Sequence, residues 1–368
     1  MRLSARQWLA VAALVALVLI AAPWLWKKVE RFDTGADYRI PYALSKDYWL
    51  YERRLDRLAP TDIVMIGDSV IWGEYVRADG TLPHFLGEQS SQPGKFVNAG
   101  VNGLFPLAFE GLVCDYAAAI RNRKVIVHLN LLWMSSPKAD LSTKKEERFN
   151  HADLVAQFSP PIPCYKADLN RRLSVTVERH FTFMQWANHL QVAYFGQKNI
   201  LAWTLDDEGA EPPRLPHAYE NPARQITLTV PAEPAIDPER GPSSARHKPW
   251  STTGEGSTRF EWVALEQSLQ WAAFRRLVKL LQSRGNDVFV IVGPFNEHIM
   301  SAENRPAFRR LRDNAAEWLT KNQIAHVTPE TLPSVLYADA SHPLTEGYRV
   351  LADRLIQDAA FQKWIRAQ

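Results

Sequence analysis

Two short polar motifs near opposite ends of the 368-residue chain contain side chains that together can perform nucleophilic catalysis. Ser69 follows Gly67 and Asp68 in the first motif, and His342 stands three residues after Asp339 in the second. A serine hydroxyl becomes an effective nucleophile when a neighbouring base takes its proton and a third group orients that base. Ser69, His342 and Asp339 therefore predict a nucleophile, its base and the carboxylate that orients the base.

The sequence around each motif favours a role beyond that of a simple turn. Residues 63–66 form a continuous apolar run, which is typical of a strand buried on both faces of a parallel sheet. Ligands bind beyond the carboxyl ends of such strands, which is where Ser69 stands. An aspartate three residues before a histidine lies on the same side of a helical turn, and His342 alone among the ten histidines has one.

The rest of the chain predicts the scaffold that must bring the two motifs together. Further apolar runs indicate strands at residues 96–97, 125–129, 287–292 and 324–327. The spacing of apolar residues indicates helices at residues 107–121, 262–282, 307–321 and 345–361. Because strands alternate with helices, the sequence predicts an α/β fold with a mainly parallel sheet.

Two more blocks lie in order between the motifs, a glycine-containing block at residues 98–103 and Asn130 directly after a predicted strand. Together the four blocks resemble the SGNH (GDSL-like) hydrolase superfamily, over residues 61–135 and 285–361. The resemblance implies a three-layer α/β/α, flavodoxin-like fold. The third block departs from the family pattern Gly-x-Asn-Asp, because residues 128–131 read His-Leu-Asn-Leu.

The resemblance also implies a role for each site residue. Ser69 attacks an ester carbonyl, His342 takes the serine proton and returns it to the leaving alcohol, and Asp339 orients His342. The oxyanion hole comprises the backbone N–H groups of Ser69 and Gly103 and the side-chain amide of Asn130. The alternative role for Asn130 is to cap the end of its strand.

Five further residues stand just past predicted strand or motif ends and are candidates to line the cleft: Gly100, Trp72, Trp133, Asn296 and His298. Gly100 is an alternative to Gly103 as the glycine that lets the backbone approach the substrate. Trp72 and Trp133 either stack on a sugar or pack beneath the loops. His298 is a rival base, but it has no aspartate or glutamate three residues before it.

The cysteines and histidines show no metal-binding pattern. Cys114 and Cys164 stand outside any C-x-x-C or similar spacing, so neither a metal nor a cofactor is expected. In an oxidising compartment the two cysteines could form a disulfide, and the alternative is two separate buried thiols.

The composition of residues 1–28 predicts a membrane anchor. The segment from Trp8 to Trp26 carries no charge, and at ~1.5 Å per residue it spans roughly 28 Å, close to the thickness of a bilayer core. A cleaved signal peptide is the rival interpretation, although the apolar run is long for one and no clear cleavage site follows it. The rest of the chain is expected to be extracytoplasmic, in the periplasm, held to the cell membrane by this single span.

The remaining sequence divides into regions of different character. We expect a neck at residues 29–60, a catalytic domain formed by residues 61–135 and 259–368, and a large insertion at residues 136–258. Nine prolines stand between Pro212 and Pro249 in the insertion. So many residues without a backbone donor predict a long loop or lid there rather than a helix or sheet.

Composition and motifs together narrow the function. Lys plus Arg (43) nearly balances Asp plus Glu (40), so no strong field would attract nucleic acid. We expect a serine esterase or O-acyltransferase that acts on ester groups, such as O-acetyl groups, of cell-envelope carbohydrate. One alternative is a non-catalytic polysaccharide-binding or scaffold protein with a protein partner in an envelope secretion complex. Another is an esterase of membrane lipids.

Overall fold

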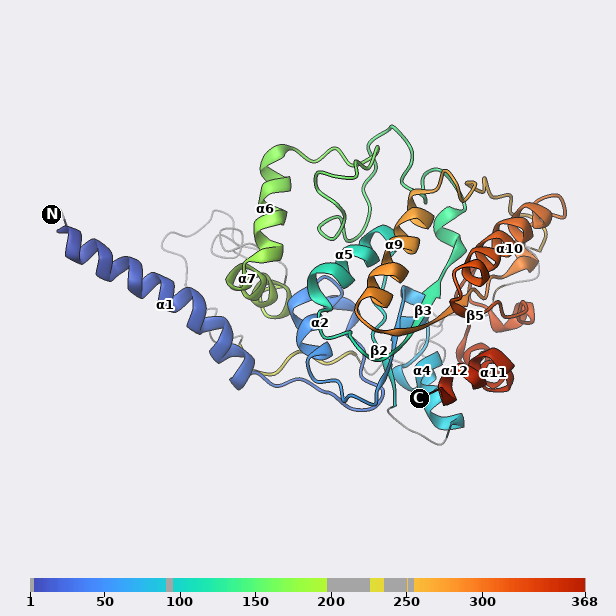
Figure 1. Ribbon diagram of the computed structural model, residues 1–368, viewed down its shortest axis with the longest axis horizontal. Coiled ribbons are helices and arrows are strands. Elements are labelled where there is room, and N and C mark those ends of the chain that lie inside the picture. The colour runs from blue at the N-terminus through green and yellow to red at the C-terminus, as the bar shows by residue number, and fades with distance from the viewer. Residues whose placement is uncertain (1–2, 91–94, 197–225, 235–249, 251–254, 368) are drawn as a thin grey trace, which may run out of the picture.

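A five-stranded parallel sheet lies at the centre of the computed structural model, which describes residues 3–90, 95–196, 226–234, 250 and 255–367 (Figure 1). Its strands are β1 (Ile63–Ile66), β2 (Phe96–Asn98), β3 (Lys124–Leu129), β4 (Asp287–Val292) and β5 (Ala325–Val327). They pair in the order β2-β1-β3-β4-β5, and every pair is parallel. This is the strand order of flavodoxin-like open sheets, and it confirms the predicted α/β class.

Helices cover both faces of the sheet. One face packs against α2 (Tyr48–Leu55), α5 (Pro106–Tyr116), α9 (Leu269–Ser283) and α10 (Arg305–Lys321). The other packs against α3 (Ser69–Trp72), α4 (Leu82–Gln89), α11 (Thr345–Gln357) and α12 (Ala359–Arg366). Successive strand side chains point to opposite faces, so Val64 and Ile66 belong to the first core and Ile63 and Met65 to the second. Short 3-10 helices occupy Tyr42–Leu44, Ala78–Gly80, Leu131–Met134, Glu297–Ile299 and Ser334–Leu336.

Three helix boundaries differ from those expected from the sequence, and local capping explains two of them. The helix expected at 262–282 begins only at Leu269, because Ser268 caps it and the buried carboxylate of Asp140 accepts from Ser268 and from two backbone N–H groups of its first turn. The helix expected at 345–361 is broken by Asp358, which caps α12. The helix expected at 107–121 ends at Tyr116, since Ala117 leaves the helical conformation.

The N-terminal helix α1 (Ala5–Val29) is 25 residues long, has a mean hydropathy of 2.4 over its most apolar part, and is almost entirely exposed. It projects from the folded body (Figure 1). Ser4 and Gln7 form a capping box at its start. Among the described residues, α1 is the one helix long and apolar enough to cross a membrane.

The carboxyl end of α1 is fixed to the body by buried charges. The carboxylate of Glu30, which follows α1, accepts hydrogen bonds from Arg53 of α2, from His189 and from Tyr194. The second ring nitrogen of His189 lies 2.6 Å from Asp47. Burial alone would lower the pKa of His189, but these two carboxylates raise it to about 9. The junction is therefore a buried charge cluster rather than a loose linker.

Residues 29–60 and part of the insertion pack against the domain. Helix α2 is buried in the first core, and residue Arg31 pairs through its backbone with Leu228 and Val230 of the insertion. The insertion also contains α6 (Leu169–His180) and α7 (Thr182–Ala193). The loop or lid predicted between Pro212 and Pro249 lies outside the described residues except for 226–234. Cys114 is exposed and Cys164 is buried, and both are free thiols, so the disulfide alternative is not formed.

Candidate active site

The Gly67–Ser69 motif and the Asp339–His342 motif meet at the carboxyl edge of the sheet. Ser69 is the first residue of α3, directly after β1, and is 5% exposed. His342 Nε2 lies 2.7 Å from Ser69 Oγ, and His342 Nδ1 lies 2.8 Å from each carboxylate oxygen of Asp339. The imidazole therefore bridges the hydroxyl and the carboxylate, as general-base activation of a serine requires.

The loop that carries Asp339 is held from both sides. Asp339 Oδ1 also accepts the backbone N–H groups of Ser341 and His342, at 2.9 and 3.0 Å. Behind the loop, the Asn296 side chain donates to the backbone carbonyl of Asp339 and its backbone N–H donates to that of Ala340. Asn296 is fully buried. It was a candidate cleft residue, and the structure places it as a support for the carboxylate loop.

The charges around His342 favour its protonated form. Burial alone would lower the pKa of His342, but the hydrogen bond and charge of Asp339, together with the charge of Glu74, raise it above its usual value. For Asp339, burial opposes ionisation, but the contacts with His342 prevail and lower its pKa. The base is thus stronger than a free imidazole and is paired with an ionised carboxylate at neutral pH.

Glu74 belongs to the site although no sequence motif marks it. Its Oε2 lies 3.3 Å from His342 Nε2, the same nitrogen that contacts Ser69. The chain reaches this position because the residues on either side, Gly73 and Tyr75, adopt left-handed backbone angles with φ of 89° and 69°. The Tyr75 ring meets the His342 ring edge-on, with centroids 5.3 Å apart. A second carboxylate and an aromatic ring therefore flank the base.

Arg39 holds this turn in place. Its guanidinium donates to the backbone carbonyls of Trp72, Gly73 and Val76 and pairs with Glu233 of the insertion at 2.8 Å. It also stacks 3.9 Å above the Trp72 ring, whose Nε1 donates to a backbone carbonyl of the neck. Trp72 is 5% exposed, so it packs beneath the loop and is not a sugar platform.

Replacing Glu74 by glutamine is expected to shift the pH–rate profile of the ester cleavage that the sequence predicts. His342 acts as a base only when neutral, so activity rises as the pH passes its pKa from below. Glu74 is one of the charges that raise this pKa, and removing it moves the rising limb to lower pH. The profiles of wild type, Glu74→Gln and the exposed-site control Glu88→Gln would be compared. A limb that stays in place, or moves to higher pH, contradicts this electrostatic role.

The two backbone donors expected for an oxyanion hole have no hydrogen-bond partner in the part of the protein that the structure describes. Within the described residues, neither the N–H of Ser69 nor that of Gly103 is engaged in a hydrogen bond. Gly103 has φ of 70°. The Asn102 carbonyl, in the same peptide group as the Gly103 N–H, accepts from His151 Nε2 at 2.8 Å. Because a trans peptide points its C=O and N–H in opposite directions, His151 fixes the direction of the Gly103 N–H.

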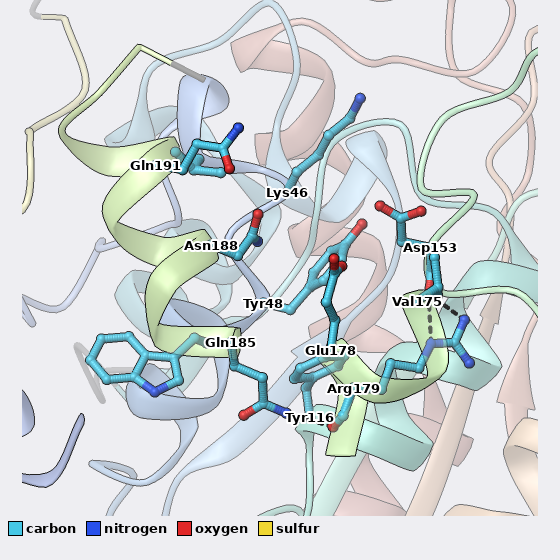
Figure 2. Close-up of a pocket in the computed structure, with 12 residues that line it drawn as sticks. Lys46, Tyr48, Tyr116, Asp153, Val175, Glu178, Arg179, Gln185, Asn188 and Gln191 are labelled. Atoms are coloured by element: carbon cyan, nitrogen blue, oxygen red, sulfur yellow. Dashed lines mark hydrogen bonds between the residues drawn. The ribbon is translucent and has the colours of Figure 1, made fainter. Parts of the chain in front are cut away.

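The His151 contact leads to a polar pocket in another part of the molecule. Its Nδ1 accepts from the Tyr48 hydroxyl at 2.9 Å, and burial lowers the pKa of His151 to about 4, so the ring is neutral at pH 7. Tyr48 lines a pocket between α2, α6 and α7 with charged and amide side chains around its mouth (Figure 2). Tyr48 and His151 thus connect the wall of this pocket to the peptide that presents Gly103.

Asn130 has the capping role considered for it, and its amide keeps a hydrogen that the predicted oxyanion role would use. Its Oδ1 accepts the backbone N–H of Leu132, so it caps the strand end. Its Nδ2 donates to Asp68 Oδ2 at 2.8 Å. An amide nitrogen carries two hydrogens, which leaves one for a substrate oxygen. Gly100 has a structural role, because a Cβ there would lie 2.4 Å from the backbone nitrogen of Trp72.

The buried carboxylate of Asp68 connects several residues of the site. It accepts from Val70 N–H, Asn130 Nδ2, Trp133 Nε1 and His128 Nδ1, at 2.8–3.1 Å. His128 Nε2 faces the carbonyl of Gly293 at 3.0 Å, so each ring nitrogen of His128 lies within hydrogen-bond distance of an oxygen atom. Burial opposes the ionisation of Asp68, but the contacts with His128 and Trp133 lower its pKa to about 2.

The last two cleft candidates, Trp133 and His298, have different outcomes. Trp133 remains near the nucleophile through Asp68 and packs against Phe105, with its ring partly exposed. His298 Nε2 instead donates to the backbone carbonyl of Leu332 at 3.0 Å, whereas the ring that contacts Ser69 Oγ is that of His342. His298 is therefore not a member of the triad.

Comparison with known proteins adds no identity. No protein-family model matches the chain, and no curated protein matches its sequence. The described residues contain no cluster of three or more histidine, cysteine, aspartate or glutamate side chains that could hold a metal ion.

Proposed function

We propose that this protein is an SGNH-type serine esterase or O-acyltransferase that acts on O-acetyl or similar small acyl esters of cell-envelope carbohydrate. The observation that carries the proposal is the His342 imidazole, which contacts Ser69 Oγ and the Asp339 carboxylate through its two nitrogens. Helix α1, long and apolar enough to cross a membrane, supports a site of action at the envelope. The periplasmic location of the catalytic domain is part of the proposal.

The geometry supports a two-step acyl transfer. His342 Nε2 takes the Ser69 proton as Oγ attacks the ester carbonyl, and the resulting oxyanion meets the N–H groups of Ser69 and Gly103 and the free amide hydrogen of Asn130. The tetrahedral intermediate collapses, the C–O bond to the leaving alcohol breaks, and His342 returns the proton to that alcohol. The acyl group now esterifies Ser69. A second alcohol or a water molecule, deprotonated by His342, then takes the acyl group and frees the serine.

The proposal is tested by trapping the acyl-enzyme. The full-length protein in detergent is incubated with a small activated acetyl ester and quenched with acid, and its peptides are examined by mass spectrometry. We expect an acetyl group on the peptide that contains Ser69, in the wild type and in the control Ser283→Ala, whose hydroxyl only bonds the backbone of α9. Ser69→Ala should lack the adduct and the turnover.

The same incubation separates the alternatives. Acetylated product from added oligosaccharides, formed only when Ser69 is present, indicates transfer, and release of acetate alone indicates hydrolysis. Equal turnover by wild type and Ser69→Ala, with no adduct on either, overturns the enzymatic proposal and favours a binding or scaffold protein.

A further inference from the structure

Helix α6 has its apolar side turned outwards. Leu169, Leu173, Val177 and Phe181 recur at every fourth position and are 61%, 48%, 54% and 41% exposed. Only Val175 of this helix is buried. A surface helix of a soluble protein normally buries its apolar stripe against the core. These four side chains, the α6 stripe, form one continuous exposed apolar strip on a helix that is otherwise polar.

The polar side of α6 is attached to the body, which fixes this orientation. Arg172 donates to the backbone carbonyls of Gln157 and Tyr165, and Arg179 donates to those of Asp153 and Val155. Arg171 and Arg179 also form ion pairs with carboxylates of the body. Since these contacts satisfy the guanidinium groups, the helix cannot turn its apolar side inwards without breaking them.

The α6 stripe is continuous with the membrane-spanning helix. Its last residue, Phe181, and Phe183 of α7 form a groove with Leu19, Ile20, Pro23 and Trp24 of α1. Trp26 of α1 packs on Trp186 of α7, with ring centroids 5.9 Å apart. Figure 1 shows α6 and α7 on the side of the body from which α1 projects.

The position of this groove along α1 indicates whether it lies in the bilayer or in water. Trp24 and Trp26 lie at the end of the apolar segment, where tryptophans mark the interface of a bilayer. Leu19 precedes Trp26 by about seven residues, which is roughly 10 Å along a helix. If α1 crosses the membrane, the part of the groove lined by Leu19 and Ile20 therefore lies below the interface, within the hydrocarbon, while Lys27, His180 and Thr182 also line the groove.

We propose that the α6 stripe and the α6–α7 turn are inserted in the same bilayer that α1 crosses, and that lipid acyl chains cover them. The occupant is lipid because the stripe adjoins the hydrocarbon-facing part of α1 and is wholly apolar. Together with the buried Glu30–His189 junction, this second contact holds the catalytic domain at a fixed orientation to the membrane surface. The inference rests on α1 and does not depend on the proposed enzymatic activity.

The test measures the surroundings of α6 in the full chain. Exposed Cys114 is replaced by serine, and single cysteines are introduced at Leu173 or Val177 and labelled with a small fluorophore. A matched control carries the cysteine at Glu317, an exposed position on α10. The variant Cys114→Ser alone, which retains buried Cys164, measures the background fluorescence from labelling at Cys164. All proteins are reconstituted in vesicles of phosphatidylethanolamine and phosphatidylglycerol.

Two quenchers then decide the result. We expect nitroxide on the lipid acyl chain to quench the labels at 173 and 177 several-fold more than the label at 317, and iodide in the buffer to show the reverse order. Iodide quenching at 173 and 177 equal to that at 317 overturns the proposal, because the stripe would lie in water. Protection from both quenchers also overturns it, because protein, from this chain or a second copy, would then cover the stripe.

Discussion

Replacing His342 by alanine is expected to slow cleavage of a small activated acetyl ester by about 10³–10⁴-fold at neutral pH. The imidazole is the base within hydrogen-bond distance of Ser69 Oγ, at 2.7 Å, and the carboxylate of Asp339 holds its other nitrogen. Without it, Ser69 keeps its proton and the leaving alcohol receives none. Residual turnover comes from binding and from the oxyanion donors.

The matched control is His298→Ala, which removes the rival base identified in the sequence. His298 Nε2 is engaged with the Leu332 carbonyl, so we expect the rate to stay within a few-fold of the wild type. Residues that act as one unit are not additive, and the double variant Ser69→Ala/His342→Ala should be little slower than either single variant. A large loss of activity in His298→Ala, with activity retained in His342→Ala, would identify His298 and not His342 as the base.

Ser69, His342 and Asp339 can be recognised in the sequence because the signals that mark them are local. The apolar run at 63–66 places Ser69 at a strand end, and the three-residue offset puts Asp339 beside His342 without any knowledge of the fold. Parallel pairing of the sheet then brings the two motifs to one edge. The strands are predictable for the same reason, since each contains a short stretch of mainly apolar residues.

The remaining site residues depend on contacts between distant segments, which periodicity does not record. Glu74 approaches His342 only because two neighbours adopt left-handed angles, and Arg39 reaches this turn from the neck. Asp68 appeared in the sequence only as the middle of a tripeptide, whereas its four donors come from two different strand ends. Trp72 shows the opposite case, where a position beside the nucleophile proved to be a packing position.

The His128–Asp68 pair also gives a physical account of the atypical third block. In place of the glycine of the Gly-x-Asn-Asp pattern this chain has His128, whose Nδ1 contacts Asp68, and a Cβ at Gly67 would meet the His128 Cβ at 2.8 Å. Gly67 therefore leaves room for the larger residue. The carboxylate of Asp68, beside Ser69, contacts this larger residue, so Gly67, Asp68 and His128 are best understood as one unit.

Replacing Asp68 by alanine is expected to lower the free energy of unfolding by about 3–5 kcal/mol, because it leaves the buried His128 ring and three further buried donors without their acceptor. Thermal or urea unfolding of the full chain in detergent measures the loss. The control Asp79→Ala removes an exposed ion pair with Arg77 and should cost at most about 1 kcal/mol. Equal stability of Asp68→Ala and the wild type would show that the pair contributes nothing.

Two further measurements separate the pair from a simple loss of packing. In a cycle of Asp68→Asn, His128→Asn and the double variant, contact between the partners predicts a coupling of about 0.5–3 kcal/mol, with the double variant less unstable than the sum. The folded pKa of Asp68, about 2, lies below the ordinary value of about 3.9. Its stabilisation is therefore present above that ordinary value and lost as the pH falls towards 2. The difference in free energy of unfolding between wild type and Asp68→Ala should therefore become smaller over that pH range. A packing defect would leave this difference constant.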